Sequence, residues 1–335
     1  NYKGAKIQPL VFFCNELAFF MVSLIKDQIE LLMKLCSSLK TCLFFLCSGL
    51  ALTAQNKEVV ITIDTLSPQV FMLTGQGGNI GIYVGTDHVF MIDDQFDRLS
   101  EKIKASISKL SDRPITFLFN THMHGDHTGG NASFNGPRTT IVAHDNVRNR
   151  VLEREKKNLE EAKISEEYFK NMLPELSFSD NITFYDGDET ILGFHVHQAH
   201  TDGDALVYFM ANNVLHMGDT YFANRYPYID LKSGGSVEGL IETQKKALML
   251  INDETIIIPG HGRPSNKKEL SAYIGMLEEL RKNVDMAIMA GASLEEVKAN
   301  SKITANYDAT YDGGFISAEA IRETFYMSLQ HKESE

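Results

Sequence analysis

The chain has 335 residues, of which 43% are hydrophobic and 23% are charged, and it contains no tryptophan. This composition is typical of a globular protein with one large or two small domains. The formal net charge of −12 is spread along the chain without a lysine- or arginine-rich tract, so we expect no nucleic-acid partner.

The first 54 residues contain a predicted export signal. From Met33 the sequence reads MKLCSSLKTCLFFLCSGLALTAQN, with two lysines before an apolar run and small residues after it. The run is as long as a signal-peptide core and short for a bilayer span. We therefore predict a signal peptide over residues 33–54 and a periplasmic or secreted bacterial protein, with an uncleaved membrane anchor as the alternative. Residues 1–32 form an upstream extension that we do not expect in the mature protein.

The cysteines limit the kinds of site that the mature chain can build. All four lie in the N-terminal part, at Cys14, Cys36, Cys42 and Cys47. The predicted mature chain therefore has none, and its core must hold it together without disulfides. Any metal site in it must use His, Asp, Glu and water.

From residue 57 onward, strand patterns alternate with helix patterns, which predicts one α/β domain over residues 57–335. Apolar stretches between Gly, Asp and Asn turns predict strands at 59–64, 70–75, 80–85, 89–94, 115–120, 139–144, 182–187, 189–200, 205–211, 213–219 and 255–260. Helical spacing predicts helices at 97–110, over the charged stretch 146–172, at 239–250 and in the C-terminal part.

The stretch TGQGGNIG, residues 74–81, matches a dinucleotide-binding fingerprint only in part. Ile80 stands where the third glycine belongs, and the residues after it alternate as in a strand. We interpret the stretch as a β-hairpin with glycines in its turn.

The densest group of functional side chains lies in NTHMHGDHTGGN, residues 120–131, which follows a predicted buried strand. This H-x-H-x-D-H spacing arises by chance at a rate on the order of one in a thousand. In a turn, His122 and His124 can share one cation while Asp126 and His127 face a second. The alternative is a polar turn with solvated histidines.

Such a site needs further ligands, and three residues stand at the ends of later predicted strands. His200 ends the strand 189–200, Asp219 ends the strand 213–219, and His261 follows the strand 255–260. Together with the histidine-rich turn, these residues predict one metal centre.

These motifs resemble the metallo-β-lactamase-fold superfamily of binuclear zinc hydrolases over about residues 57–270, and especially its exported bacterial cyclase-like or β-lactamase-like group. The resemblance implies a four-layer αββα sandwich of two mixed β-sheets flanked by helices, with two Zn²⁺ ions at one edge. It assigns the first zinc to His122, His124 and His200, the second to Asp126, His127 and His261, and the bridging position to Asp219. Asp93 resembles an aspartate that supports the ligands from behind, with a simple turn aspartate as the alternative.

Asp219 separates this chain from the better-known members of the superfamily. One subclass of true β-lactamases has a cysteine near this position, and the subclass that shares the Asp-His pair usually lacks a bridging acid there. An aspartate resembles the thioesterases, lactonases and phosphodiesterases of the superfamily.

The resemblance and the ligand chemistry predict hydrolysis of a small-molecule substrate. Two zinc ions lower the pKa of a shared water and give a metal-bridging hydroxide, which the catalytic Asp126 would orient. The scissile bond would belong to an ester, thioester, amide or lactam, or phosphodiester. A β-lactamase proper, an iron-dependent sulfur dioxygenase of the same fold and a non-catalytic metal-binding scaffold are the alternatives.

Three further residues belong to the surroundings of the predicted centre. His197 either lines the cavity or packs at the surface. Tyr221 begins an aromatic loop that either walls the substrate cleft or packs on itself, and Arg225 in the same loop could bind a substrate carboxylate.

Overall fold

The computed structural model describes Gln28, Met33 and residues 58–332. Residues 59–332 belong to one compact unit. The predicted signal peptide and upstream extension lie outside the described residues apart from Gln28 and Met33, so both stay predictions. Within the described part of the chain, no helix combines the length and the apolar character that crossing a membrane requires.

The first sheet has seven strands that follow one another in chain order. The first four are antiparallel neighbours, and the pairs from β4 to β7 are parallel. The strands are β1 (Thr62–Thr65), β2 (Val70–Thr74), β3 (Ile80–Val84), β4 (Val89–Ile92), β5 (Phe117–Asn120), β6 (Thr140–His144) and β7 (Leu176–Phe178).

The second sheet has six strands in the order β13-β12-β11-β10-β9-β8. Only the pair β11–β12 is parallel, so this sheet is also mixed. Its strands are β8 (Asn181–Asp186), β9 (Glu189–His195), β10 (Ala205–Phe209), β11 (Val214–Phe222), β12 (Ile256–His261) and β13 (Ser265–Asn266).

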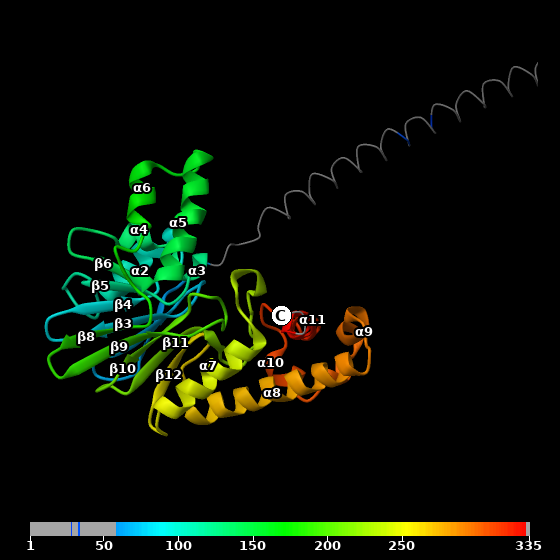
Figure 1. Ribbon diagram of the computed structural model, residues 1–335. Coiled ribbons are helices and arrows are strands. Elements are labelled where there is room, and N and C mark those ends of the chain that lie inside the picture. The colour runs from blue at the N-terminus through cyan, green and yellow to red at the C-terminus, as the bar shows by residue number, and fades with distance from the viewer. Residues whose placement is uncertain (1–27, 29–32, 34–57, 333–335) are drawn as a thin grey trace, which may run out of the picture. The chain divides into compact units, whose positions relative to one another are not determined.

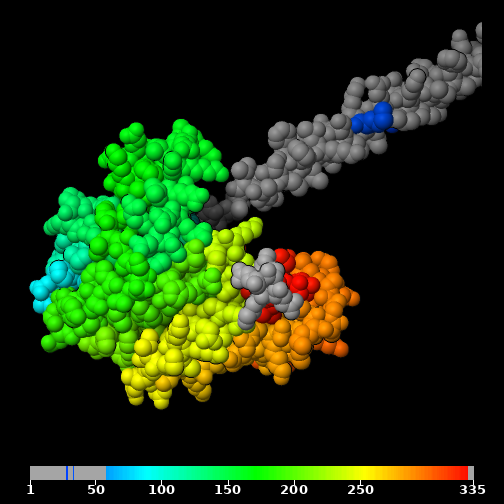
Figure 2. Space-filling model, in the orientation of Figure 1, coloured from blue at the N-terminus to red at the C-terminus, as the bar shows by residue number. Residues whose placement is uncertain are grey.

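Helices cover the outer face of each sheet (Figure 1). The first sheet carries η1 (Asp97–Leu99), α2 (Ser100–Ile107), α3 (Gly125–Thr128), α4 (Asn131–Phe134), α5 (Asp145–Glu160) and α6 (Glu166–Asn171). The second half of the chain adds η2 (Leu231–Ser233), α7 (Val237–Leu250), α8 (Lys267–Met289), α9 (Leu294–Ala299), η3 (Ser301–Ile303), α10 (Asp308–Tyr311) and α11 (Ala318–Lys332). Of these, α7 contacts β11 and α8 contacts α7, whereas α9 packs on α11. The ends of α5 and α6 project from the body as a raised part of the surface (Figure 2).

Three apolar clusters correspond to the three interfaces between four layers. Phe90, Phe119 and Val207 belong to the cluster between the sheets. Side chains of α2, such as Ile103, pack on the outer face of the first sheet, and those of α7, α8 and α11 pack on the second. The predicted αββα sandwich is confirmed.

The glycine-rich stretch joins β2 to β3, which pair as antiparallel neighbours. The hairpin interpretation is therefore confirmed, and residues 75–79 form its turn.

The charged helix and the strand predicted to end at His200 differ from the structure. The charged stretch forms two helices, α5 and α6, because the first ends at Glu160 and Ser165 caps the second by accepting from the Tyr168 amide. The strand predicted over 189–200 ends at His195, because the Asp204 carboxylate accepts hydrogen bonds from the His200 and Thr201 amides and folds the chain into a turn.

A histidine stack joins the two sheets beside this turn. The rings of His144, at the end of β6, and His195, at the end of β9, lie parallel with their centroids 3.7 Å apart. His195 donates from Nδ1 to the Asp204 carbonyl, and His144 donates from Nε2 to the Ser179 carbonyl. Burial, reinforced by the adjacent His144 imidazole, lowers the pKa of His195 to about 4.

This stack predicts a loss of stability in mild acid. Because the pKa of His195 is lower in the folded than in the unfolded chain, the unfolded chain binds more protons between pH about 6.5 and 4. The free energy of unfolding should therefore fall as the pH decreases through this window. His195→Gln, which does not titrate, should show a smaller fall than the wild-type chain in urea denaturation at matched zinc concentrations. Equal pH dependence of the two proteins would refute this.

Candidate metal centre

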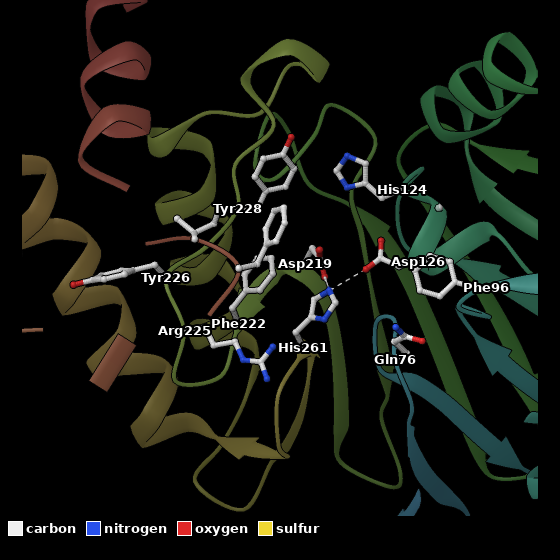
Figure 3. A pocket seen from close by; sticks show the side chains of 13 residues that line it. Gln76, Phe96, His124, Asp126, Asp219, Phe222, Arg225, Tyr226, Tyr228 and His261 are labelled. Atoms are coloured by element: carbon white, nitrogen blue, oxygen red, sulfur yellow. Dashed lines mark ion pairs between the residues drawn. The ribbon is translucent and has the colours of Figure 1, made fainter. Parts of the chain in front are cut away.

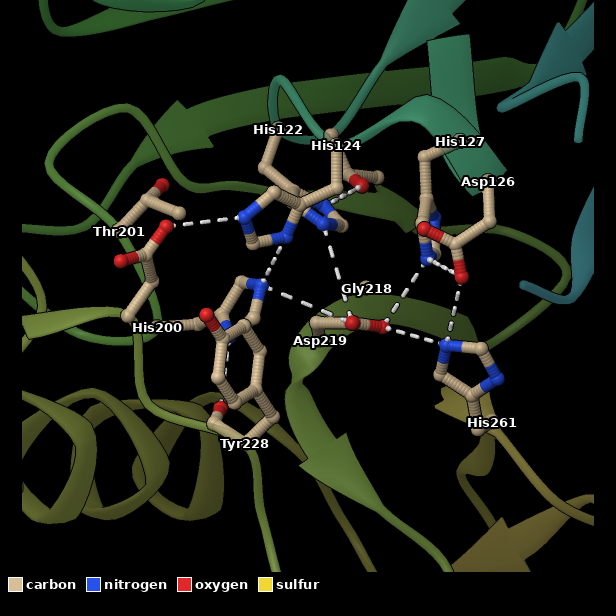
Figure 4. A network of polar contacts seen from close by, with 12 residues as sticks. His122, His124, Asp126, His127, His200, Thr201, Gly218, Asp219, Tyr228 and His261 are labelled. Carbon is tan, nitrogen blue, oxygen red and sulfur yellow. Dashed lines mark hydrogen bonds and ion pairs between the residues drawn. The ribbon is translucent and has the colours of Figure 1, made fainter. Parts of the chain in front are cut away.

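The histidine-rich turn begins directly after β5. The His127 and Thr128 amides donate to the His124 carbonyl, which closes the first turn of α3. This tight turn brings His122, His124, Asp126 and His127 to the edge of the sandwich, where the second sheet supplies the other predicted ligands (Figure 4).

The structure brings all seven predicted ligands together in two neighbouring sets. Potential ligand atoms of His122, His124, His200 and Asp219 lie within 4.8 Å of one another. The potential ligand atoms of Asp126, His127 and His261 form the second set and also lie within 4.8 Å of one another. In the first set His124 Nδ1 and His200 Nε2 approach to 2.8 Å, and in the second His261 Nε2 lies 3.3 Å from Asp126 Oδ2. These roles as ligands stay predictions.

Asp219 lies between the two sets and faces both. Its Oδ1 is 3.1 Å from His127 Nε2 and 3.4 Å from His261 Nε2. Its Oδ2 is 3.6 Å from His200 Nε2 and 3.8 Å from His122 Nε2. A carboxylate in this position can bridge two cations.

A bulge in β11 positions Asp219. The register with β12 shifts on both sides of Gly218, whose φ of +50° favours glycine. The sequence had predicted Asp219 at the end of its strand. In the structure it lies within β11, which continues to Phe222. A bulge re-aims the side chain that follows it, which here points to the histidines (Figure 4).

Four of the histidines have their outward-facing nitrogen fixed by a hydrogen bond. His122 Nδ1 lies 3.1 Å from Thr121 Oγ1, and His127 Nδ1 lies 2.7 Å from Asp93 Oδ2. His200 Nδ1 donates to the Tyr228 carbonyl at 2.7 Å. His124 Nε2 lies 3.1 Å from the Asp230 carboxylate. Such partners fix the tautomer and leave the other nitrogen directed inward for a cation.

Asp93 has the contacts that the predicted supporting role requires. It is fully buried, and its φ of +61° places it in the left-handed region directly after β4. Its Oδ1 accepts from the Thr121 amide, and its Oδ2 accepts from Thr121 Oγ1 and faces His127 Nδ1. Both oxygens are thus occupied, so Asp93 is suited to orient His127 and not to bind a metal itself.

The inward-facing atoms fit a metal centre. His122 Nε2, His127 Nε2 and Asp219 Oδ1 are buried and have no hydrogen-bond partner. A buried polar atom without a partner is costly, and one cation per set would satisfy these atoms together. Nitrogen and oxygen donors alone, at this number, suit zinc and related divalent metals.

The pKa shifts of the cluster also favour cation binding. Burial lowers the pKa of His122 well below its usual range and that of His200 to about 4, so both are neutral at pH 7. Burial opposes ionisation of Asp219, but the adjacent His127 and His261 hold the pKa of its carboxyl well below its usual range. Burial opposes protonation of His261, yet nearby carboxylates raise its pKa to about 9. A bound cation would replace such protons.

The glycine turn between β2 and β3 covers the second set. The Gly78 amide donates to the Asp126 carbonyl at 3.1 Å. A Cβ atom on Gly78 would overlap the His127 imidazole, so only glycine fits there without movement. Sequence reasoning identified the hairpin but not this contact.

A cleft of about 540 Å³ opens beside the cluster (Figure 3). His124, Asp126, Asp219 and His261 line its inner end. The other walls are mostly aromatic and apolar, with Gln76, Phe96, Phe222, Arg225, Tyr226, Tyr228, Phe315 and Ile316. The cleft can therefore hold a small molecule against the candidate metal ligands.

Of the residues assigned to the surroundings, Arg225 does line the cleft, whereas Tyr221 and His197 do not. Tyr221 is buried, packs on Tyr273 with ring centroids 5.0 Å apart, and bonds to Ser265 Oγ. His197 is exposed beside His195, because β9 has ended and the expected strand alternation no longer applies.

Four contributions to the centre were missed in the sequence: Thr121, the Tyr228 carbonyl, Asp230 and Gly78. Thr121 adjoins the first histidine, and Asp230 ends the aromatic loop, so their positions carried a weak signal. The roles of the Tyr228 carbonyl and of Gly78 cannot be recognised in the sequence without the fold.

A family model described as "Metallo-beta-lactamase superfamily" matches residues 73–261, which is more than half of the chain and includes all seven predicted ligands. The chain belongs to the metallo-beta-lactamase superfamily. Family membership and the buried His/Asp cluster make it a metal-dependent hydrolase of this superfamily. The resemblance inferred from the sequence is confirmed.

Solved structures share the fold at low identity. The DIM-1 metallo-beta-lactamase is 19% identical with a TM-score of 0.53, covering 66% of this chain and 99% of its own. A metallo-beta-lactamase from Pontibacter korlensis is 16% identical with a TM-score of 0.52, covering 65% and 99%. The inverting sec-alkylsulfatase Pisa1 from Pseudomonas sp. is 14% identical with a TM-score of 0.61, covering 80% and 50%. No curated protein sequence matches the chain.

The Gly78 contact predicts a metal-binding defect. Gly78→Ala should displace the His127 ring and weaken zinc binding about 10–100-fold, as loss of a supporting partner does. Competition with a chromophoric chelator measures the affinity. Gly136→Ala is the control, since a Cβ there meets nothing within 4 Å. If both variants bind zinc like the wild-type chain, the glycine turn does not hold the centre.

Proposed function

We propose that the chain is an exported hydrolase that uses two zinc ions to cleave an ester, thioester, amide or lactam, or phosphodiester bond of a small molecule. The observation that carries the proposal is the placement of Asp219, whose two oxygens face two different sets of imidazole nitrogens. This arrangement supports two neighbouring cations and not one. We assign the first to His122, His124 and His200 and the second to Asp126, His127 and His261, with Asp219 shared.

Zinc ions bound there would supply Lewis-acid polarisation of the substrate and a water of lowered pKa. Asp126 and Asp219 both line the cleft, and Asp126 is the more exposed of the two, with 28% of its side chain exposed against 6%. Burial raises its pKa, but His127 and His261 outweigh this and lower it to about 2, so it is ionised at neutral pH. As a hydrogen-bond acceptor, Asp126 orients the attacking water toward the substrate.

Other cleft residues hold the substrate and exclude water. Phe222 stacks on His261 with an interplanar angle of 3°, which fixes that imidazole and shields one side of the inner end. Arg225 is exposed at the cleft wall, and within residues 58–332 no carboxylate pairs with it. We assign to it an anionic group of the substrate.

A substrate panel tests the reaction class. Zinc-loaded protein should hydrolyse at least one member of a set comprising an acyl-homoserine lactone, an aryl thioester, a bis-phosphodiester and nitrocefin. Turnover of nitrocefin above all others would favour the β-lactamase alternative. Consumption of dioxygen with an iron-loaded chain, and no hydrolysis with zinc, would favour the sulfur dioxygenase. Inactivity in every arm with both zincs bound would favour a non-catalytic scaffold.

Asp219→Ala separates a bridge from an ordinary ligand. The variant should fold, bind the second zinc more weakly and lose far more activity than the 10–100-fold typical of a supporting partner. Added zinc should restore only part of the activity, because occupancy can return without the bridging geometry. Asp253→Ala, at a side chain that is 90% exposed, is the matched control. Near-normal turnover with both zincs retained would show that Asp219 is no bridge.

The export proposal rests on residues 33–54 and on the position of all four cysteines before residue 58. A chain expressed from Met33 in a bacterium should appear in the periplasm, shortened to about Gln55. N-terminal sequencing of the fractionated protein decides between this result and an unprocessed chain in the membrane fraction, which would favour an anchor.

A further inference from the structure

One wall of the cleft comes from outside the part of the chain that the family model matches. Phe315 and Ile316 lie between α10 and α11, far beyond residue 261. Phe315 is 87% exposed, whereas Ile316 beside it is buried. A large aromatic side chain that is exposed at the wall of a cleft leaves apolar surface available to a ligand.

The backbone holds Phe315 in this position. The Asp312 carboxylate accepts from the Gly313 amide at 2.8 Å and from the Ala318 amide at 3.2 Å, which closes residues 312–318 into a compact turn. Gly313 has a φ of +98°, and a Cβ on Gly314 would lie 3.3 Å from three side-chain carbons of Arg225. The turn therefore packs on the stem of Arg225 and presents Phe315 beside it.

The turn is also attached to the aromatic loop that follows β11. The Tyr226 amide donates to the Tyr311 carbonyl at 3.0 Å, and the Tyr226 hydroxyl donates to Asp308 at 2.9 Å. These bonds join α10 to the loop that carries Arg225 and Tyr228. The C-terminal turn is thus part of a fixed cleft wall.

Tyr228 connects this wall to the candidate metal centre. Its ring meets Phe315 edge-on, with centroids 5.9 Å apart and an interplanar angle of 86°. The same ring lies 5.8 Å from His124 and 5.7 Å from His200. An apolar group that contacts Phe315 and Tyr228 would therefore belong to a molecule whose other end reaches the metal ligands.

We propose that Tyr228, Phe315 and Ile316 form a subsite for an apolar acyl or aryl group of the substrate, and that Phe315 determines the preferred size of that group. The inference rests on the proposed function, because it assigns one part of the same substrate. Burial of apolar surface against Phe315 favours larger groups, since each methylene removed from water contributes to binding.

Hydrolysis of p-nitrophenyl acetate, butyrate and octanoate by the full-length zinc-loaded chain tests the subsite. The wild-type kcat/KM should rise with the length of the acyl group. Phe315→Ala should lower kcat/KM for the octanoate about tenfold and leave the acetate within about twofold, because only the longer chain reaches the subsite. Phe315→Leu should restore most of the loss. The control is Tyr185→Ala, which removes an aromatic side chain that is 75% exposed on β8.

A binding measurement separates this inference from the proposed function. Calorimetry should show that octanoate binds the wild-type chain more tightly than acetate, and that Phe315→Ala removes most of the difference. If no ester is hydrolysed but this binding pattern holds, the esterase chemistry fails and the subsite stands. If acetate and octanoate behave alike, or Phe315→Ala affects both equally, the subsite is refuted.

Discussion

The Asp219 carboxylate is the constraint on which the rest of the site depends. It is buried, and imidazole nitrogens of four histidines lie within 3.8 Å of its two oxygens. A buried carboxylate is costly unless charge and hydrogen bonds compensate for it. Here its Oδ1 lacks a hydrogen-bond partner, as do His122 Nε2 and His127 Nε2. Two cations around this carboxylate would satisfy the whole cluster, which is why the fold can carry so many polar groups at one edge.

Both sheets contribute residues to the candidate metal centre. The first sheet delivers the histidine-rich turn after β5 and Asp93 after β4, and the second delivers Asp219 from the bulge in β11 and His261 from β12. Residues behind the centre fix four of the five imidazoles, so the sites are largely formed before a cation binds. Two turns that lie far apart in the sequence also line the cleft. Gln76 comes from the glycine turn, and Phe315 and Ile316 come from the C-terminal turn.

The sequence predicted the residues of the centre better than it predicted their surroundings. The H-x-H-x-D-H spacing and the position of His261 at the end of an apolar strand pattern are local, so they could be recognised without the fold. His200 was also identified, although the strand expected to end at it stops at His195. The bulge at Gly218, the end of β9 at His195 and the burial of Tyr221 depend on contacts with distant residues. The subsite at Phe315 was missed for the same reason, since nothing in residues 312–318 alone places them beside the histidines.

Elemental analysis of the purified mature protein tests the central claim most directly. The arrangement around Asp219 predicts about two zinc ions per chain, bound through nitrogen and oxygen atoms only. X-ray absorption at the zinc edge would show that ligand set and a neighbouring metal atom. A single tightly bound iron per chain, or zinc at one equivalent that excess metal does not raise, would contradict a binuclear centre organised by Asp219.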